Sequence, residues 1–268
     1  DHDRLYSEKG LIAAFREAGF HTVFLSNQRR NHSYIDFLGS EANYSHFIRD
    51  DYAGNNEDDK YSDELLLPYV KRVLDERHNK LLVVLHTYGS HFNYRDRYVQ
   101  SNARFLPDTP TEAKAENRPQ LLNAYDNTIL QTDRILAKLI SMLREQGCVS
   151  TLMYTSDHGE NIFDDHRRLF LHASPRPSQY DTDVPLIVWT SKTYATQHPI
   201  EFRAMLGNRN KGVQSNASVF PTLLGLAGIE TRARVDSLSL TNPRYRLGTR
   251  HYLNDHNHAV PLVMYGIK

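Results

Sequence analysis

Four short apolar segments dominate the hydrophobic pattern of the chain. They cover residues 21–26, 81–86, 151–156 and 184–189, and each is rich in aliphatic side chains. Within each segment the apolar residues are continuous rather than alternating with polar ones. Continuous runs of this length are typical of strands covered on both faces, as in a parallel sheet. The pattern therefore predicts four buried strands.

Helical periodicity fills much of the chain between these strands. Apolar residues recur at helical spacing over 7–18, 63–75, 121–146 and 216–226, and Gly19, Gly147 and Gly228 follow three of these segments. Alternating strands and helices predict an α/β fold, with a mostly parallel sheet in a three-layer α/β/α sandwich. Residues 50–63 and 93–119 are polar and read as loops within one domain, 1–268. For the longest helix we expect one apolar face, formed by Leu122, Ile129, Leu136, Leu139, Ile140 and Leu143.

Composition and charge exclude several functions. The 268 residues contain 32 Lys and Arg against 32 Asp and Glu, so the formal net charge is zero. No overall basic field is present to bind nucleic acid or an anionic membrane. The longest apolar runs, 81–85 and 223–226, are far too short for a transmembrane helix. The single Cys148 excludes an intrachain disulfide and any multi-cysteine metal site.

The unusual feature of the composition is its 14 histidines. Ligands of open α/β sheets bind outside the carboxyl ends of the strands, which selects among these histidines. Strand 81–86 leads to His91, and strand 151–156 leads directly to Asp157 and His158. A further histidine, His172, lies shortly before the strand at 184–189. We expect these side chains to converge at one edge of the sheet.

Asp157 and His158 are the candidate metal ligands. A carboxylate oxygen and an imidazole nitrogen both suit Zn²⁺. Gly159 permits the turn that adjacent ligands of one ion need, and Glu160 is placed to accept a hydrogen bond from an imidazole and orient it. The structural alternative is an ordinary loop or helix start in which Asp157 is the N-cap.

His91, Arg95 and Arg97 have a functional and a structural interpretation. Guanidinium groups near a metal form phosphate clamps, whereas exposed arginines in a charged segment are usually only solvated. His91 either converges on the candidate metal site with His172 or is a polar loop residue. His86 lies at a strand end, where a structural role and a functional role are equally compatible with the sequence. We interpret His251, His256 and His258 as polar residues of the surface or core without a functional role.

Four ordered motifs resemble those of bacterial phosphoethanolamine transferases. Residues 87–98 resemble the "GSH…Y…RY" signature, and 122–133 resemble the helix that follows it. Residues 154–160 match the "SDHGE" segment, and 172–189 resemble the "HG.P…P.I.W" region. "SDHG" alone would be weak, because sulfatases share it, but the four together span about 100 residues.

The resemblance implies the alkaline-phosphatase-like fold of the sulfatase superfamily. It implies an enzyme of the bacterial inner membrane whose catalytic domain faces the periplasm and holds one or two zinc ions. The donor is phosphatidylethanolamine and the acceptor is lipid A or another envelope glycan. In such enzymes the counterparts of Asp157 and His158 bind zinc. The counterparts of His91 and His172 contact the phosphoryl group or a second zinc, which makes both catalytic candidates here, with Arg97 as a weaker substrate-binding candidate.

The rest of the family's site does not map onto this sequence. The family's Thr nucleophile and Glu zinc ligand precede the segment that residues 5–26 resemble. We therefore expect the chain to be part of a longer, membrane-anchored protein. The usual glycine after His172 is Ala173 here, and the disulfides of many relatives are missing. Two alternatives stay open: a sulfatase-like ester hydrolase, and a non-catalytic metal-binding domain.

Overall fold

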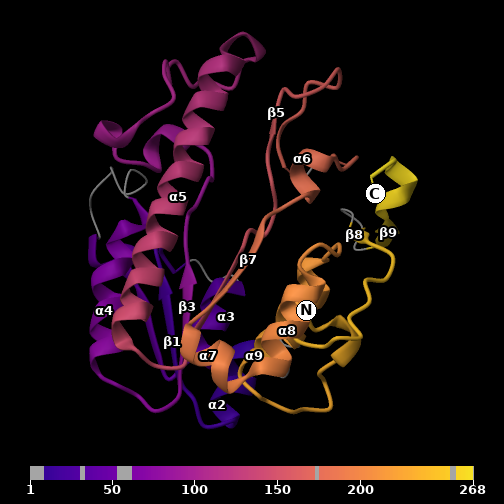
Figure 1. The fold of residues 1–268 in the computed structure, drawn as a ribbon. Helices are drawn as coiled ribbons and strands as arrows, with labels where there is room; N and C mark the ends of the chain where they lie inside the picture. The colour runs from indigo at the N-terminus through magenta and orange to yellow at the C-terminus, as the bar shows by residue number, and fades with distance from the viewer. Residues whose placement is uncertain (1–8, 31–33, 53–61, 173–174, 254–257, 268) are drawn as a thin grey trace. The chain divides into compact units, whose positions relative to one another are not determined.

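The computed structural model describes residues 9–30, 34–52, 62–172, 175–253 and 258–267 (Figure 1). Contacts along the chain divide it into two compact units, residues 1–142 and 143–268. The two units are described in turn. The assignment of the whole chain to one domain stays a prediction.

The first unit is built on a parallel three-stranded sheet. Its strands are β1 (His21–Ser26), β2 (Tyr44–Phe47) and β3 (Leu81–His86), in the order β2-β1-β3. β1 pairs with β3 from His21 opposite Leu81 to Ser26 opposite His86. The structure confirms the predicted bounds of β1 and β3, whose apolar runs are continuous. It adds β2, an edge strand whose four residues include two polar ones and therefore carry little strand signal.

Helices lie on both sides of this sheet (Figure 1). Ile12 of α2 packs with Phe24 and Phe47 in a buried cluster, and Ile35 of α3 lies against it. α4 follows the short η3 turn and begins with Pro68 in its first turn, where a missing N–H costs nothing. The helical elements of this unit are α2 (Leu11–Glu17), α3 (Tyr34–Glu41), η1 (Ile48–Tyr52), η3 (Asp63–Leu66), α4 (Leu67–Asp75), η4 (Tyr94–Asp96), η5 (Gln100–Asn102), η6 (Ala115–Asn117) and α5 (Arg118–Gln146), whose end runs into the second unit.

The buried face of α5 differs from the predicted apolar face. Ile129 is 47% exposed, whereas the polar Asn127 and Gln131 are buried. The Asn127 side chain exchanges hydrogen bonds with the backbone of residues 104 and 105, and the Gln131 amide donates to Ser62 Oγ. Of the predicted face only Leu139 is buried. The prediction was wrong because hydrogen bonds made in the interior, by both ends of the Asn127 amide and by the Gln131 amide nitrogen, offset much of the cost of burying these side chains.

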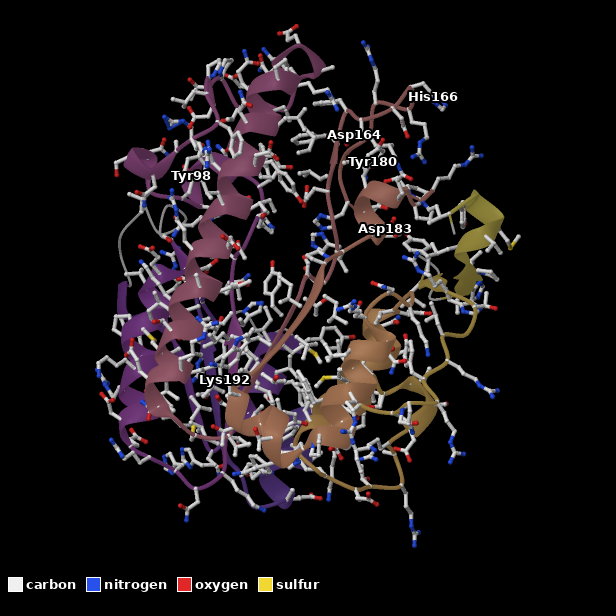
Figure 2. All side chains as sticks on the ribbon, in the orientation of Figure 1. Tyr98, Asp164, His166, Tyr180, Asp183 and Lys192 are labelled. Carbon is white, nitrogen blue, oxygen red and sulfur yellow. The ribbon has the colours of Figure 1, made fainter. Side chains whose placement is uncertain are left out.

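The described residues of the second unit form three antiparallel pairs of strands. β4 (Thr151–Thr155) pairs with β7 (Leu186–Thr190), β5 (Asn161–Ile162) with β6 (Phe170–Leu171), and β8 (His251–Leu253) with β9 (Ala259–Pro261). The turn between β5 and β6 carries Asp164 and His166 (Figure 2). The helical elements are α6 (Gln179–Thr182), α7 (Lys192–Gln197), α8 (Pro199–Asn208), α9 (Ser215–Leu226), η7 (Asp236–Leu238) and η8 (Leu262–Tyr265).

The pairing of β4 with β7 departs from a purely parallel arrangement. The chain between them forms a hairpin and the four-residue α6, and its described residues contain no long helix that could carry the chain back for a parallel crossover. Both predicted strands are present, with bounds shifted by one or two residues. No helix in the described parts of the chain is long and apolar enough to cross a membrane.

A buried tyrosine in α7 gives the fold a testable pH dependence. Tyr194 is buried, and its hydroxyl has no hydrogen-bond partner among the described residues. Burial, with a smaller contribution from the Glu201 carboxylate, raises the pKa of Tyr194 to about 12. An unfolded chain titrates its tyrosines near pH 10. The stability linked to this proton is thus fully present below about pH 10 and is lost as the pH rises towards about 12.

We expect Tyr194→Phe to remove this part of the alkaline loss of stability. At pH 7 the substitution should raise the free energy of unfolding by about 1 kcal/mol, because it deletes a buried hydroxyl without a partner. Urea unfolding at pH 7 and pH 11 measures both effects. Tyr34→Phe, at an exposed position, is the matched control. Identical pH profiles for Tyr194→Phe and the unmodified protein would contradict the assignment.

Candidate metal centre

Two histidines and a glutamate of the second unit meet just beyond the end of β4. The imidazole rings of His158 and His172 stack with their centroids 3.6 Å apart. Glu160 Oε1 lies 3.0 Å from His172 Nδ1 and 3.9 Å from His158 Nδ1. One ligand atom from each of the three side chains lies within 4.8 Å of the others. Two imidazoles and a carboxylate form a donor set for a divalent transition metal.

The register of the β5–β6 hairpin explains why Glu160 meets His172. Asn161 pairs with Leu171 in this antiparallel ladder. Glu160 precedes Asn161 and His172 follows Leu171, so the two occupy the next pair of facing positions. Side chains at facing positions lie about 5 Å apart at Cβ, within reach of a hydrogen bond. The contact places Glu160 at hydrogen-bond distance from an imidazole, as the sequence predicts, and that imidazole belongs to His172.

The turn that presents His158 depends on glycine. A Cβ added at Gly159 would lie 2.1 Å from the carbonyl oxygen of Tyr180, so no other residue fits without moving the backbone. The Gly159 N–H donates to the Asp181 carbonyl at 2.9 Å. Ser156 Oγ donates to the His158 carbonyl at 2.6 Å. These contacts hold the His158 backbone close to α6.

Asp157 lies beside His158 but outside this three-residue group. Its side chain is 87% exposed, and its Oδ2 lies 3.7 Å from His158 Nε2. The Asp157 carboxylate also accepts a hydrogen bond from the His158 N–H at 3.0 Å. The His158 ring therefore has one carboxylate near each nitrogen, Asp157 at Nε2 and Glu160 at Nδ1. The role of Asp157 as a metal ligand stays a prediction.

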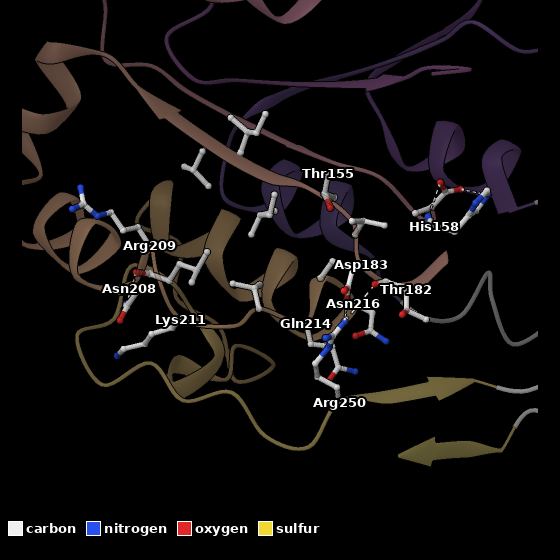
Figure 3. Close-up of a pocket in the computed structure, with 18 of the residues that line it drawn as sticks. Thr155, His158, Thr182, Asp183, Asn208, Arg209, Lys211, Gln214, Asn216 and Arg250 are labelled. Atoms are coloured by element: carbon white, nitrogen blue, oxygen red, sulfur yellow. Dashed lines mark hydrogen bonds and ion pairs between the residues drawn. The ribbon is translucent and has the colours of Figure 1, made fainter. Parts of the chain in front are cut away.

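The candidate centre lies at one end of a cavity of about 1070 Å³ (Figure 3). Arg209 and Lys211 lie at the other end, and Arg250 lies between the two ends. The Arg250 guanidinium bonds to Asp183 Oδ1 at 2.9 Å. Sequence reasoning missed these basic residues, because they lie in polar segments with no motif around them. The centre thus opens into a space with both apolar and cationic walls.

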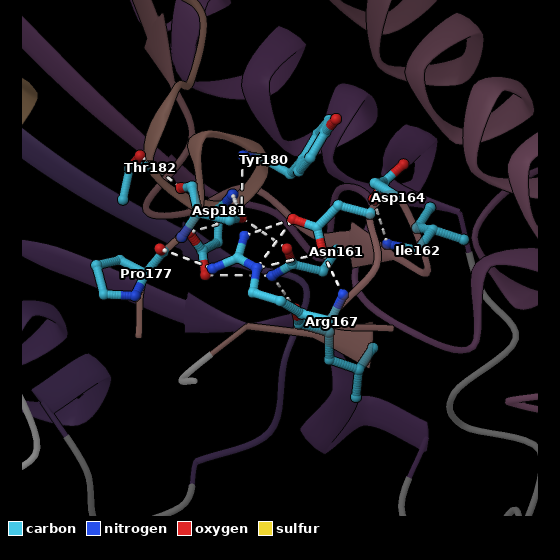
Figure 4. A network of polar contacts seen from close by, with 11 residues as sticks. Asn161, Ile162, Asp164, Arg167, Pro177, Tyr180, Asp181 and Thr182 are labelled. Atoms are coloured by element: carbon cyan, nitrogen blue, oxygen red, sulfur yellow. Dashed lines mark hydrogen bonds and ion pairs between the residues drawn. The ribbon is translucent and has the colours of Figure 1, made fainter. Parts of the chain in front are cut away.

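A network of polar contacts supports the hairpin that carries the site (Figure 4). Asn161 Nδ2 donates to the Leu171 carbonyl at 2.8 Å and to Asp181 Oδ2 at 3.2 Å. Ser178 caps α6 and donates to Asn161 Oδ1 at 2.6 Å. Arg167 bridges Asp165 and the Pro177 carbonyl. The network connects the hairpin to α6, which is the element that also contacts Gly159.

The first unit holds the other predicted site residues, His91 and Arg97. His91 is exposed in the loop after β3, and its Nδ1 contacts the Phe92 carbonyl. Arg97 is only 5% exposed. Its guanidinium donates to the carbonyls of His91 at 3.0 Å and Phe92 at 3.3 Å, and it lies 4.3 Å from the centre of the Tyr88 ring. The described contacts of Arg97 are therefore with the loop that carries His91, and its role in substrate binding stays a prediction.

The buried carboxylate of Asp63 also holds this loop. It accepts hydrogen bonds from Asn27 Nδ2 at 2.7 Å, the Tyr88 N–H at 2.9 Å and the Gly89 N–H at 2.8 Å. From α5, Thr128 Oγ1 donates to Ser90 Oγ at 2.6 Å. The loop that carries His91 is therefore fixed at several points. Sequence reasoning missed Asp63, whose only local signal is that of an acidic residue at the start of a helix.

The chain matches the family model described as "Sulfatase" over residues 2–229. It is 28% identical over 237 residues to phosphoethanolamine transferase EptA of Salmonella typhimurium, which covers 86% of this chain and 42% of that protein. It is also 28% identical over 233 residues to Kdo(2)-lipid A phosphoethanolamine 7''-transferase of the same organism, covering 84% of this chain and 40% of that one. The chain thus spans less than half the length of either curated relative.

A solved structure has the same fold. The zinc complex of the C-terminal periplasmic domain of EptC from Escherichia coli matches with a TM-score of 0.82 and 22% identity, over 95% of this chain and 71% of that one. This likeness confirms the α/β, alkaline-phosphatase-like fold. The match to the family model covers most of the chain and includes both units. The chain therefore belongs to the sulfatase family.

Proposed function

We propose that this chain is the catalytic part of a zinc-dependent phosphoethanolamine transferase that modifies lipid A or another envelope glycan. The observation that carries the proposal is the group formed by His158, Glu160 and His172, in a chain similar to named transferases over more than four fifths of its length. Both curated relatives are transferases of phosphoethanolamine, and the name of one includes lipid A. The solved relative is a zinc complex.

The donor set supports zinc as the metal. Zn²⁺ accepts imidazole and carboxylate ligands at about 2.0–2.2 Å, and its catalytic sites keep one position open. His158 with Asp157 supplies one imidazole and one carboxylate, and His172 with Glu160 supplies a second such pair. When bound, zinc lowers the pKa of an attacking hydroxyl and neutralises charge on phosphoryl oxygens. One or two ions fit this set of donors.

The remaining roles follow from how the side chains are held. Glu160 is buried and bonded to His172 Nδ1, which orients the ring and leaves Nε2 for a phosphoryl oxygen or a leaving group. Imidazole suits proton transfer because its ordinary pKa is close to neutrality. His91, on its fixed loop, has the same proposed role. The proposed nucleophile is a threonine outside these 268 residues, whose hydroxyl attacks the phosphodiester of phosphatidylethanolamine and releases diacylglycerol. The acceptor then attacks the phosphoethanolamine-threonine intermediate, which frees the threonine hydroxyl.

The proposed location follows from the same relatives. The solved structure is a periplasmic domain. We place this chain in the periplasm, attached to the inner membrane by a part of the protein outside these 268 residues. The proposed donor is a phospholipid of that membrane, the proposed acceptor is a lipid or glycan of the envelope, and no nucleic acid takes part.

Mass spectrometry of lipid A and envelope glycans tests the function. The full-length gene product is expressed in a host without phosphoethanolamine transferases of its own, and the lipids are compared with those of the empty host. We expect a lipid A or glycan species that is heavier by one phosphoethanolamine group, and its loss when zinc is chelated. Release of free phosphoethanolamine, with unmodified acceptors, would instead identify a hydrolase. Zinc binding without either product would identify a non-catalytic binding domain.

A further inference from the structure

A second group of metal-ligand side chains lies in the first unit, at the amino end of the sheet. His21 is the first residue of β1, and Glu76 and His78 lie in the turn between α4 and β3. The rings of His21 and His78 stack, with centroids 3.9 Å apart and planes 8° apart. His78 Nε2 lies 2.9 Å from Glu76 Oε2. One ligand atom from each side chain lies within 4.8 Å of the others.

The backbone holds these three residues in place. The His21 N–H donates to the Lys80 carbonyl at 2.9 Å, which ties the turn to β1 directly beside His78. Arg77, between the two turn ligands, has a φ of +52°, and this left-handed residue reverses the chain between Glu76 and His78. Two side chains that are neighbours in the turn therefore both reach His21. The juxtaposition depends on the fold, because 57 positions separate His21 from His78.

The distances are close to those that a metal ion needs. A tetrahedral ion with ligands at about 2.0 Å holds neighbouring ligand atoms about 3.3 Å apart. Modest side-chain rotations bring the ligand atoms of the three residues to that distance. The Glu76 side chain is 51% exposed and has room for such a rotation. The nearby Lys80 does not compete for the carboxylate, since its Nζ donates to the Ala18 carbonyl and lies over the Phe20 ring.

The second imidazole distinguishes this group from an ordinary histidine–carboxylate pair. His46 and Asp51 form such a pair at the same distance, 2.9 Å. The rings next to His46 belong to Tyr44 and Tyr69, which offer no imidazole nitrogen. Two imidazoles with one carboxylate are a donor set typical of zinc and other borderline divalent metals, whereas one imidazole with one carboxylate rarely suffices.

We propose that His21, Glu76 and His78 bind a divalent transition metal, with Zn²⁺ as the probe of choice. The site is separate from the candidate metal centre, whose residues all belong to the second unit. Within the first unit it lies about 17 Å along β1 from Ser26, at the end of the sheet opposite to the loop that carries His91. A metal there would fasten the α4–β3 turn to the first residue of β1, which is a structural role.

Zinc titration of the full-length gene product tests this site. The background variant is His158→Ala/His172→Ala, which removes the candidate metal centre, and zinc is titrated against a chromogenic chelator after metal depletion. We expect the background variant to bind one equivalent of zinc. Adding His78→Ala should weaken that binding by more than about 100-fold. This loss of affinity exceeds the loss caused by mutating residues that only surround a metal ligand and leave the ligand itself in place. Adding His46→Ala should leave it unchanged.

Glu76→Ala provides an independent test of the site if the histidine variants fold poorly. Glu76 is an exposed turn residue, so its truncation leaves the sheet intact, and we expect at least a 10-fold loss of affinity. The proposal is overturned if the background variant binds no further zinc. It is also overturned if Glu76→Ala and His78→Ala leave the zinc equivalent of the background variant unchanged, or if that equivalent depends on His46.

Discussion

Replacing His158 with alanine in the full-length gene product is expected to abolish zinc binding at the candidate metal centre and phosphoethanolamine transfer together. The His158 ring has a carboxylate near each nitrogen, so its removal takes away the donor at the centre of the group. A metal that stabilises charge in a transition state contributes several kcal/mol, and about 4 kcal/mol corresponds to a thousandfold in rate. We therefore expect transfer to fall by at least about 10³-fold. Zinc content and lipid A mass spectra of the same preparation measure both losses.

Two further variants make this result specific. Asp157→Ala is expected to have the same effect, because the Asp157 carboxylate is the second proposed zinc ligand. His166→Ala removes an exposed histidine from the turn of the β5–β6 hairpin and should leave both zinc content and transfer unchanged (Figure 2). These variants are measured in a His78→Ala background, which removes the zinc ion bound at the proposed site of His21, Glu76 and His78. In that background, unchanged zinc stoichiometry in the Asp157 and His158 variants would refute the metal assignment.

The largest loss of stability is expected from Asp63→Ala. The substitution removes the acceptor of three hydrogen bonds, from the Asn27 side chain and from the backbone of Tyr88 and Gly89. A buried donor left without a partner costs about 1–3 kcal/mol. Partial relaxation and entry of water reduce the sum, so we expect the free energy of unfolding to fall by about 3 kcal/mol. The midpoint of urea unfolding measures this change.

The control for Asp63→Ala is the same substitution at an exposed carboxylate. Asp75→Ala removes an exposed partner of Lys71 in an i,i+4 pair on α4, and such a pair contributes only about 0.3–0.5 kcal/mol. Asp63→Asn keeps the shape and one acceptor oxygen, and should cost about half as much as Asp63→Ala. Equal midpoints for Asp63→Ala and Asp75→Ala would show that the three hydrogen bonds do not hold the loop.

Asp63 and Arg97 together explain why the loop that carries His91 is well defined. Asp63 binds two of its N–H groups, and Arg97 binds the carbonyls of His91 and Phe92. The two side chains therefore satisfy donors and acceptors that no strand or helix satisfies. In the sequence, Arg97 reads as a phosphate clamp, because guanidinium groups commonly bind phosphate. Only the fold shows that Arg97 is buried and that its guanidinium donates to loop carbonyls.

Much of the fold was predictable from local pattern. β1 and β3 have the predicted bounds because their aliphatic runs are continuous, and the carboxyl ends of β3 and β4 lead to His91 and His158 as expected. The edge strand β2 was not predictable, because a strand exposed on one side needs few apolar residues. The buried face of α5 was mispredicted for the converse reason, since the polar Asn127 and Gln131 are buried and bond to residues far away in sequence.

The sequence by itself determined the family, the α/β class and most of the residues in which the chemistry is expected, because motifs such as 154–160 combine residue type with strand position. Only the tertiary structure decided which side chains meet. Glu160 faces His172 through the register of a two-residue ladder, and His21 stacks on His78 through the pairing of β1 with β3. The physical reason is that local pattern reports burial and backbone conformation, whereas contacts between distant residues depend on strand register and on hydrogen bonds across the chain.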